Sequence, residues 1–325
     1  MSLPGTRDTY YEPFPGHMEA TTPYLPYIPS RDVAYGAGGV FAALLLGTLG
    51  LAALARARVF AAAAVASACL MVSMFLRGSL ARDMERVRMY EASLVLTTGG
   101  ANAILLLAAL LLARWVRFLE GARSPFAALV AAVGATAAIG AAVLECVAVP
   151  LVFGAGAWHR HVGHLLRVST MSVTLAASGL GLLVTAWKAA TTEPRITAEA
   201  AALAGPFAMV AVWASFVLAQ AKMPPTSTAS TSETAYYLLD VLPLGLALLL
   251  WLALNAPRLF GFAKDLPLTN RAAARWSGHY DCHYQYPSLP ADHDYSYPVR
   301  VPAPGPRAGG ADRGDAVQQA MLRYS

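Results

Sequence analysis

Long apolar stretches, separated by short polar connections, run through most of the chain. A helix needs about 20 consecutive apolar residues to cross the roughly 30 Å hydrocarbon core of a bilayer. Seven stretches of this kind follow one another, and five of them carry no charged residue. They cover residues 34–55, 59–76, 92–113, 125–157, 168–187, 200–221 and 234–257. The pattern predicts an all-α membrane protein, folded as a bundle of seven transmembrane helices.

Polar segments flank this transmembrane domain, which we place at residues 34–257. Residues 1–33 form a polar tail rich in Pro and Tyr, and residues 258–325 form a polar, Pro-rich tail. We expect both tails to be largely disordered, because such compositions cannot bury enough apolar surface to fold. The first tail lacks the short apolar core of a signal peptide. We therefore expect the first helix to act as the insertion signal.

The overall composition agrees with a membrane protein and argues against several other classes. Only 13% of the 325 residues are charged, against about 25% in soluble domains. The net charge of +5 comes largely from Arg at the ends of apolar stretches, and no basic stripe with interleaved aromatic residues suggests a nucleic-acid partner. The three cysteines, at positions 69, 146 and 282, form no CxxC pair, so neither a zinc site nor a disulfide framework is predicted.

The distribution of Lys and Arg predicts the orientation, since these residues concentrate in cytoplasmic loops. With the N-terminus outside, the inner loops and the C-terminal flank carry eleven of them and the outer flanks carry eight. This bias favours an outer N-terminus and a cytoplasmic C-terminus. The Arg-rich segment 77–88 opposes it, unless Asp83 and Glu85 pair with its arginines in a short interfacial helix. We expect a plasma-membrane location, although such span lengths fit internal membranes too.

Ionisable residues inside apolar stretches are expensive to bury and are therefore candidates for function. Glu145 lies deep in the fourth stretch and Asp240 lies about two turns into the seventh. Glu91 and Glu233 stand where helices begin, and an acid there also complements the helix dipole. Glu145 is either a hydrogen-bonded neutral acid of the bundle or part of a proton relay.

The seventh stretch places its polar residues on one helical face. Glu233, Tyr237 and Asp240 are spaced i, i+4 and i+7, and Pro243 follows one turn later, where it can open the backbone hydrogen-bond ladder. Two interpretations stay open. The face either lines a polar cavity that binds a substrate, or it is a structural clamp in which Asp240 bonds to another helix.

Histidines and glycines each allow a more specific interpretation. His159, His161 and His164 cluster in a segment that we expect to be a loop, but no acid or cysteine accompanies them. A solvated, pH-sensitive loop is favoured over a metal site, and we expect no metal and no cofactor. The first helix carries a row of small residues, namely Gly36, Gly39, Gly47 and Gly50. This row serves either packing within the chain or a homo-oligomer interface.

The C-terminal helix resembles the last helix of the fungal RTA-like family, the lipid-translocating exporters. The family pattern is a Glu, an aromatic pair, an Asp, a Pro with an apolar residue, and a Pro after the span. This sequence has those elements as Glu233, Tyr236-Tyr237, Asp240, Pro243-Leu244 and Pro257.

Two further segments are similar to this family. In the third apolar stretch, the family has a Tyr, then a small or Pro turn, and then an Ala-rich helix that ends in Arg. This sequence has Met89-Tyr90-Glu91, Gly99-Gly100 and Arg114 in these places, and Glu91 replaces a frequent Gln. Tyr27–Ser30 is similar to the Pro-Ser that precedes the family's first span. The chain departs from the family at Ser215–Gln220, where an Arg and Glu pair is common.

The resemblance implies a transporter or translocator of lipid-like amphiphiles, such as sphingoid bases or amphipathic toxicants, with a role in stress or toxicant resistance. Its partners would be membrane lipids or amphipathic small molecules, and its substrate-binding residues would come from the polar positions above: Asp240, Tyr237, Glu233, Tyr236, Glu145 and Glu91. The residues leave a seven-helix receptor or sensor and a non-transporting scaffold open as alternatives. No hydrolase, zinc-protease, nucleotide or dinucleotide motif is present, so we expect no enzyme activity and no catalytic residues.

Overall fold

The computed structural model describes residues 30–55, 58–81, 86–121, 123–153, 156–191, 197–222 and 232–260. All of them belong to the unit Met1–Leu266, the first of two into which the chain divides. Most of the predicted disordered tails lies outside the described residues. The exceptions are short: the first helix begins at Arg31, and a last helical turn reaches Leu259, so residues 31–33 and 258–259 are helical.

The described residues contain helices and no strands. Seven helical segments are long and apolar enough to cross a membrane, so the chain is a multi-pass membrane protein, as its sequence predicts. The helices are α1 (Arg31–Leu54), α2 (Ala61–Leu80, preceded by the 3₁₀ turn η1 at Arg58–Phe60), α3 (Val87–Glu120), α4 (Pro125–Val152), α5 (Ala157–Thr191) and α6 (Thr197–Lys222). The seventh span consists of α8 (Glu233–Tyr236), η2 (Tyr237–Val241) and α9 (Leu242–Ala253), and α10 (Ala256–Leu259) follows it.

Several helices are longer than the apolar stretches that predicted them. The largest difference is in α5, which begins at Ala157 instead of residue 168. The expected histidine loop is therefore wrong: His159, His161 and His164 lie in the first turns of α5. A helix can extend beyond the apolar core because its polar ends reach the headgroup region and water. Among the described residues, no group of three or more His, Cys, Asp or Glu is placed to hold a metal ion.

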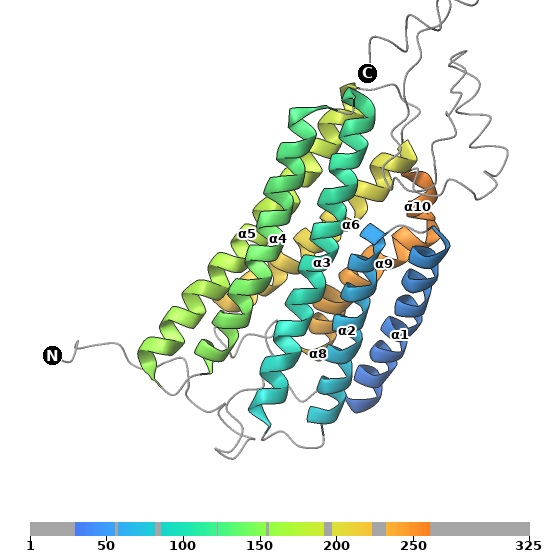
Figure 1. Cartoon of the computed structure of the whole chain (residues 1–325). Helices are drawn as coiled ribbons and strands as arrows, with labels where there is room; N and C mark the ends of the chain where they lie inside the picture. Colours follow the sequence, from blue (N-terminus) through green and yellow to red (C-terminus); the bar gives the residue numbers. More distant parts are fainter. Residues whose placement is uncertain are drawn as a thin grey trace, which may run out of the picture. The chain divides into compact units, whose positions relative to one another are not determined.

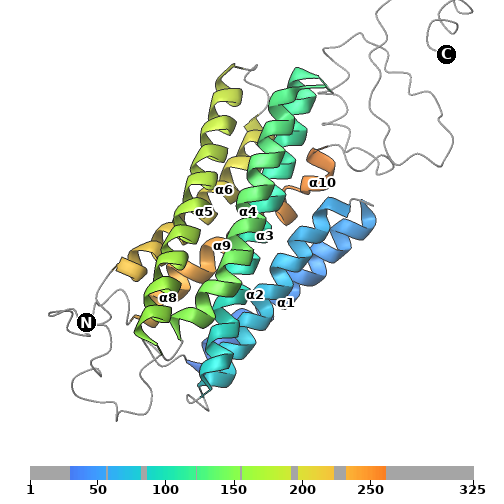
Figure 2. The same cartoon turned by 60° about the vertical axis from the view of Figure 1, so that its left-hand side comes forward.

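The bundle is arranged around α3. Sequence neighbours pack against each other from α1 to α6, the seventh span packs between α6 and α1, and α3 also contacts α5, α6 and α9 (Figures 1 and 2). In the most apolar stretch of α3, 67% of the residues are buried, against 17% in α4. We call the end of the bundle where α1 begins the N-side, and the end where α9 ends the C-side.

The glycines of α1 serve packing at only one of the four predicted positions. A Cβ atom on Gly47 would lie 3.1 Å from the Leu252 side chain of α9, so this glycine lets the first and last spans approach. Gly36, Gly39 and Gly50 face open space. Those three positions do not explain any contact within the chain, and the homo-oligomer interface stays a prediction.

The seventh span is irregular where its sequence predicts a broken ladder. Tyr237–Val241 forms a π-helical turn, and Pro243 lies at the start of the α-helix that follows. Proline has no N–H to continue the i to i−4 bonds, and π turns of this kind occur frequently at functional sites. The wider turn buries Tyr236 and Asp240, while Leu238 and Leu239 between them face outward.

Candidate functional site

Asp240 is buried in the N-side half of the bundle, with only 5% of its surface exposed. The η2 turn presents it about 10 Å from the start of the seventh span, at 1.5 Å per residue. The groups that act on its carboxyl come from three other parts of the bundle: Arg77 on α2, Trp213 on α6 and Tyr236 in the preceding turn. The Oδ1 atom of Asp240 nevertheless lacks a well-formed hydrogen bond.

Aromatic rings hold the Arg77 guanidinium beside this carboxyl. Its central carbon lies 4.0 Å from the ring centre of Tyr236 and 5.6 Å from that of Tyr90 on α3. A cation over a tyrosine face is attracted by the ring quadrupole, and the attraction is strongest where water is excluded. Arg77 is 3% exposed and Tyr236 is also 3% exposed. One carboxyl and two aromatic rings thus surround the buried Arg77 guanidinium.

Glu145 forms a second buried acidic position on α4, with no exposed surface. Its Oε1 atom lies 3.3 Å from Nε of Arg167 on α5 and accepts a long hydrogen bond of 3.5 Å from the Thr98 hydroxyl on α3. The other carboxylate oxygen, Oε2, is buried and has no hydrogen-bond partner. Arg167 also acts electrostatically on Asp240. Asp240, Glu145, Arg77 and Arg167 therefore form one connected set, which we call the acid–arginine group.

The remaining predicted site residues lie outside this group or at its edge. Glu233 accepts a hydrogen bond of 2.5 Å from the Ser30 backbone N–H and so joins the seventh span to the start of α1. Tyr237 is half-buried, and Glu233 and Arg77 both act on its hydroxyl. Glu91 is half-buried near Arg88. The structure brings Tyr236 and Asp240 together, and Arg167 connects Glu145 to them. Tyr237 lies against Tyr236, and Glu233 bonds to the Ser30 N–H.

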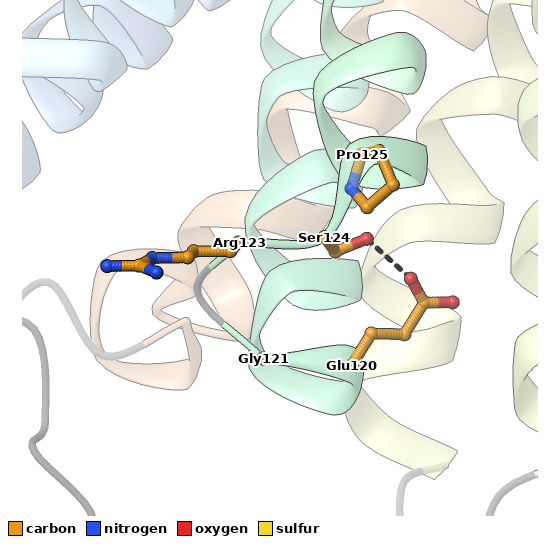
Figure 3. Close-up of a pocket in the computed structure, with 5 residues that line it drawn as sticks. All are labelled: Glu120, Gly121, Arg123, Ser124 and Pro125. Carbon is orange, nitrogen blue, oxygen red and sulfur yellow. Dashed lines mark hydrogen bonds between the residues drawn. The ribbon is translucent and has the colours of Figure 1, made fainter.

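A second acid–base pair lies at the C-side end. Lys188 on α5 forms an ion pair with Glu120 at the end of α3. Ser124 donates a hydrogen bond of 2.5 Å to Glu120 and accepts one of 3.1 Å from the Ala127 N–H, which caps α4. Glu120 and Ser124 also line an open hollow of about 470 Å³, which Figure 3 shows in close-up. It is lined by Glu120, Gly121, Arg123, Ser124 and Pro125.

Sequence reasoning missed three members of the site. Arg77 and Arg167 were assigned to the flanks of spans, whereas α2 continues to Leu80 and α5 begins ten residues before Arg167. Trp213 lies inside an apolar stretch, where a tryptophan gives no sign of a functional role. The useful signal was present in the two acids, because buried charges in membranes almost always pair with one another. Two intramembrane carboxylates therefore indicate that cations lie near them.

No protein-family model, curated protein or solved structure matches the chain. Membership in the RTA-like family stays a prediction from the helix motif. The acid–arginine group, in which two arginines lie near two buried acids, is therefore the structural feature that bears most directly on function.

Proposed function

We propose that the protein moves lipid-like amphiphiles with a positively charged headgroup across its membrane. One observation carries the proposal: the carboxyl of Asp240 and the rings of Tyr236 and Tyr90 surround a buried cation, the Arg77 guanidinium. A primary ammonium is smaller than a guanidinium and offers the same charge. It can replace Arg77 over the rings while its alkyl chain stays in the lipid.

The irregular seventh span supplies the movement that such an exchange requires. The π turn and Pro243 interrupt the regular hydrogen bonds at Asp240. The helix can therefore bend at the carboxyl that binds the headgroup, while α9 stays packed through Leu244, Leu248 and the bond from the Trp251 indole to the Ala202 carbonyl. This arrangement combines a binding group with a hinge.

The resemblance to lipid-translocating exporters supports the same class of substrate, namely sphingoid bases and amphipathic toxicants. The predicted orientation, with the N-terminus outside, would place the acid–arginine group nearer the outer leaflet of the plasma membrane. A headgroup that reaches Asp240 from the inside would then have crossed most of the bilayer. The proposed role is export, or movement from the inner to the outer leaflet, without a catalytic step.

The test is the transbilayer movement of a fluorescent long-chain amine in liposomes that contain the purified protein. We expect faster movement than in protein-free liposomes, and we expect Asp240→Asn to slow it about tenfold or more, since hydrogen bonds to charged groups contribute about 1.5–3 kcal/mol. Asp32→Asn is the matched control because Asp32 is exposed in the first turn of α1 on the same side. A wild-type rate equal to that of empty liposomes would refute the proposal.

A second pair of variants separates binding from folding. Tyr236→Phe keeps the ring over which the cation lies, and Tyr236→Leu removes it. We expect the phenylalanine variant to bind the amine like the wild type and the leucine variant to bind it more weakly. If Asp240→Asn unfolds the protein in detergent while both Tyr236 variants bind normally, the clamp interpretation of Asp240 is correct instead.

A further inference from the structure

One face of α5 carries polar side chains over most of its length, although the helix lies within an apolar bundle. Four of its buried polar residues are spaced four or seven positions apart and so share a face. We call this set the α5 polar stripe: Thr170, Thr174, Ser178 and Thr185. Arg167 precedes it and Lys188 follows it. These two residues are about 31 Å apart at 1.5 Å per residue, close to the thickness of the hydrocarbon core.

The hydroxyls of the stripe direct their protons into the protein. Thr170, Ser178 and Thr185 donate to backbone carbonyls of α5 one turn earlier, at 2.9, 2.8 and 2.7 Å. Thr174 donates to the side-chain oxygen of Asn102 on α3, at 3.2 Å. A hydroxyl has one proton and two lone pairs, so each of these oxygens keeps capacity to accept. An ammonium group, which only donates, matches such a surface, and a phosphate does not.

The N-side end of the stripe is connected to the acid–arginine group. Asn102, which accepts from Thr174, donates to the Thr98 carbonyl at 3.0 Å, and the Thr98 hydroxyl faces Glu145. The unpartnered Oε2 atom of Glu145 is fully buried there. A buried carboxylate oxygen without a hydrogen bond is costly, and a donor-only ligand would satisfy it.

Phe207 closes the stripe near its middle. This ring belongs to α6, which packs beside α5 (Figures 1 and 2), and only 1% of it is exposed. It lies against Gly181, between Ser178 and Thr185: a Cβ atom added to Gly181 would be 2.6 Å from two of the ring carbons. The apolar ring of Phe207 thus covers Gly181, which has no side chain and lies between the two ends of the stripe.

We infer that the α5 polar stripe is the path along which a protonated amine headgroup crosses the bilayer, with Phe207 as its barrier. The inference rests on the proposed function and extends it from a binding site to a route. In the proposed direction, the headgroup moves from the C-side along the acceptor oxygens when Phe207 swings away, passes Glu145 and reaches Asp240 on the N-side. A proton wire is not favoured, because the stripe hydroxyls donate to carbonyls or to Asn102 and not to one another.

Two serines on α5 provide a matched test. Ser178 and Ser172 each donate to the carbonyl one turn earlier at 2.8 Å, but Ser178 is buried in the stripe and Ser172 is exposed. In the liposome assay with the fluorescent long-chain amine, we expect Ser178→Ala to slow movement about three- to tenfold, the effect of one hydrogen bond. Ser172→Ala should move the amine at the wild-type rate, and both variants should bind it equally.

Phe207→Ala and a change of probe complete the test. We expect Phe207→Ala to speed movement of the amine, and we expect its N-acetylated analogue, which lacks the charge, to gain nothing from the protein. Equal rates in both serine variants, with Phe207→Ala unchanged and Asp240→Asn still slow, would overturn the path and leave the proposed function standing. Equally fast movement of a phosphate-headed analogue would overturn the assigned headgroup. A wild-type protein that moves no amine would defeat the proposed function, and the path with it.

Discussion

The two halves of α5 each carry an acid–base pair, but the pairs differ in their surroundings. Near the N-side, Arg167 meets Glu145, whose side chain is 1% exposed. At the C-side, Lys188 meets Glu120, whose side chain is 29% exposed. The first pair lies beside a second buried acid, Asp240, and the second lies beside the Ser124 cap of α4. The same pairing of charges therefore serves two purposes.

Burial explains this difference. A buried ion pair gains little over apolar packing, yet removing one partner leaves an uncompensated charge in a medium that solvates it poorly. An exposed pair is solvated by water and screened by salt, so it contributes little either way. The N-side pair is therefore sensitive to any group that competes for its charges, as a binding site must be. The C-side pair links the ends of α3 and α5 and contributes less to stability.

The largest effect should come from breaking the N-side pair. Glu145→Gln keeps the size of the side chain but leaves Arg167 without its counter-charge, so we expect a loss of about 3–5 kcal/mol in unfolding free energy. Thermal unfolding in detergent micelles would measure it. The double variant Glu145→Gln with Arg167→Gln should recover part of the loss, since it buries no unpaired charge. A negligible loss in the single variant would mean that Glu145 is already neutral.

An intermediate effect should follow from separating α4 and α5 near this pair. A Cβ atom on Gly163 would lie 2.8 Å from the Ala148 carbonyl oxygen, so the two backbones touch there. We expect Gly163→Ala to cost about 1–3 kcal/mol by overpacking and to weaken amine binding by shifting Arg167 away from Glu145. Gly179→Ala on the same helix meets open space and should gain up to about 1 kcal/mol in helix propensity. Equal melting temperatures for both variants would contradict the close approach.

The smallest effect should come from the C-side pair. Glu120→Gln removes the charge that Lys188 faces, but Lys188 keeps the rings of Trp187 and Phe126, at 4.2 and 5.5 Å from its ammonium. We expect a small decrease in melting temperature that disappears in about 1 M salt, where the screening length is about 3 Å. A decrease as large as that of Glu145→Gln, independent of salt, would show that the two ion pairs of α5 are equivalent.

The fold could be predicted because its determinants are local. An apolar stretch of sufficient length dictates a membrane helix whatever the rest of the chain does, and all seven spans were placed from that rule. Their ends were harder to place, since polar residues at a helix end are compatible with both helix and loop. That ambiguity explains why the predicted start of α5 lies eleven residues too late. The helix begins at Ala157 and includes His159, His161 and His164.

The site was only half predictable because its chemistry is non-local. The acids Asp240 and Glu145 stand out in any apolar stretch, and Pro243 indicates an irregular turn near them. Their partners do not stand out: Arg77 and Arg167 resemble ordinary flanking charges until the packing of α2 and α5 carries them inside. Glu233 looked like a ligand-binding acid, and only the neighbouring position of α1 showed that it binds the Ser30 N–H.

That bond between Glu233 and Ser30 joins residues 203 positions apart, and this separation sets an order of events during synthesis. A ribosome delivers α1 and α2 to the membrane long before the seventh span exists. Until that span arrives, the first helix begins without the carboxylate that bonds Ser30, and Arg77 has no Asp240 to face. Long side chains such as arginine can wait with their charge at the membrane surface. Arrival of the seventh span therefore completes the start of the first span.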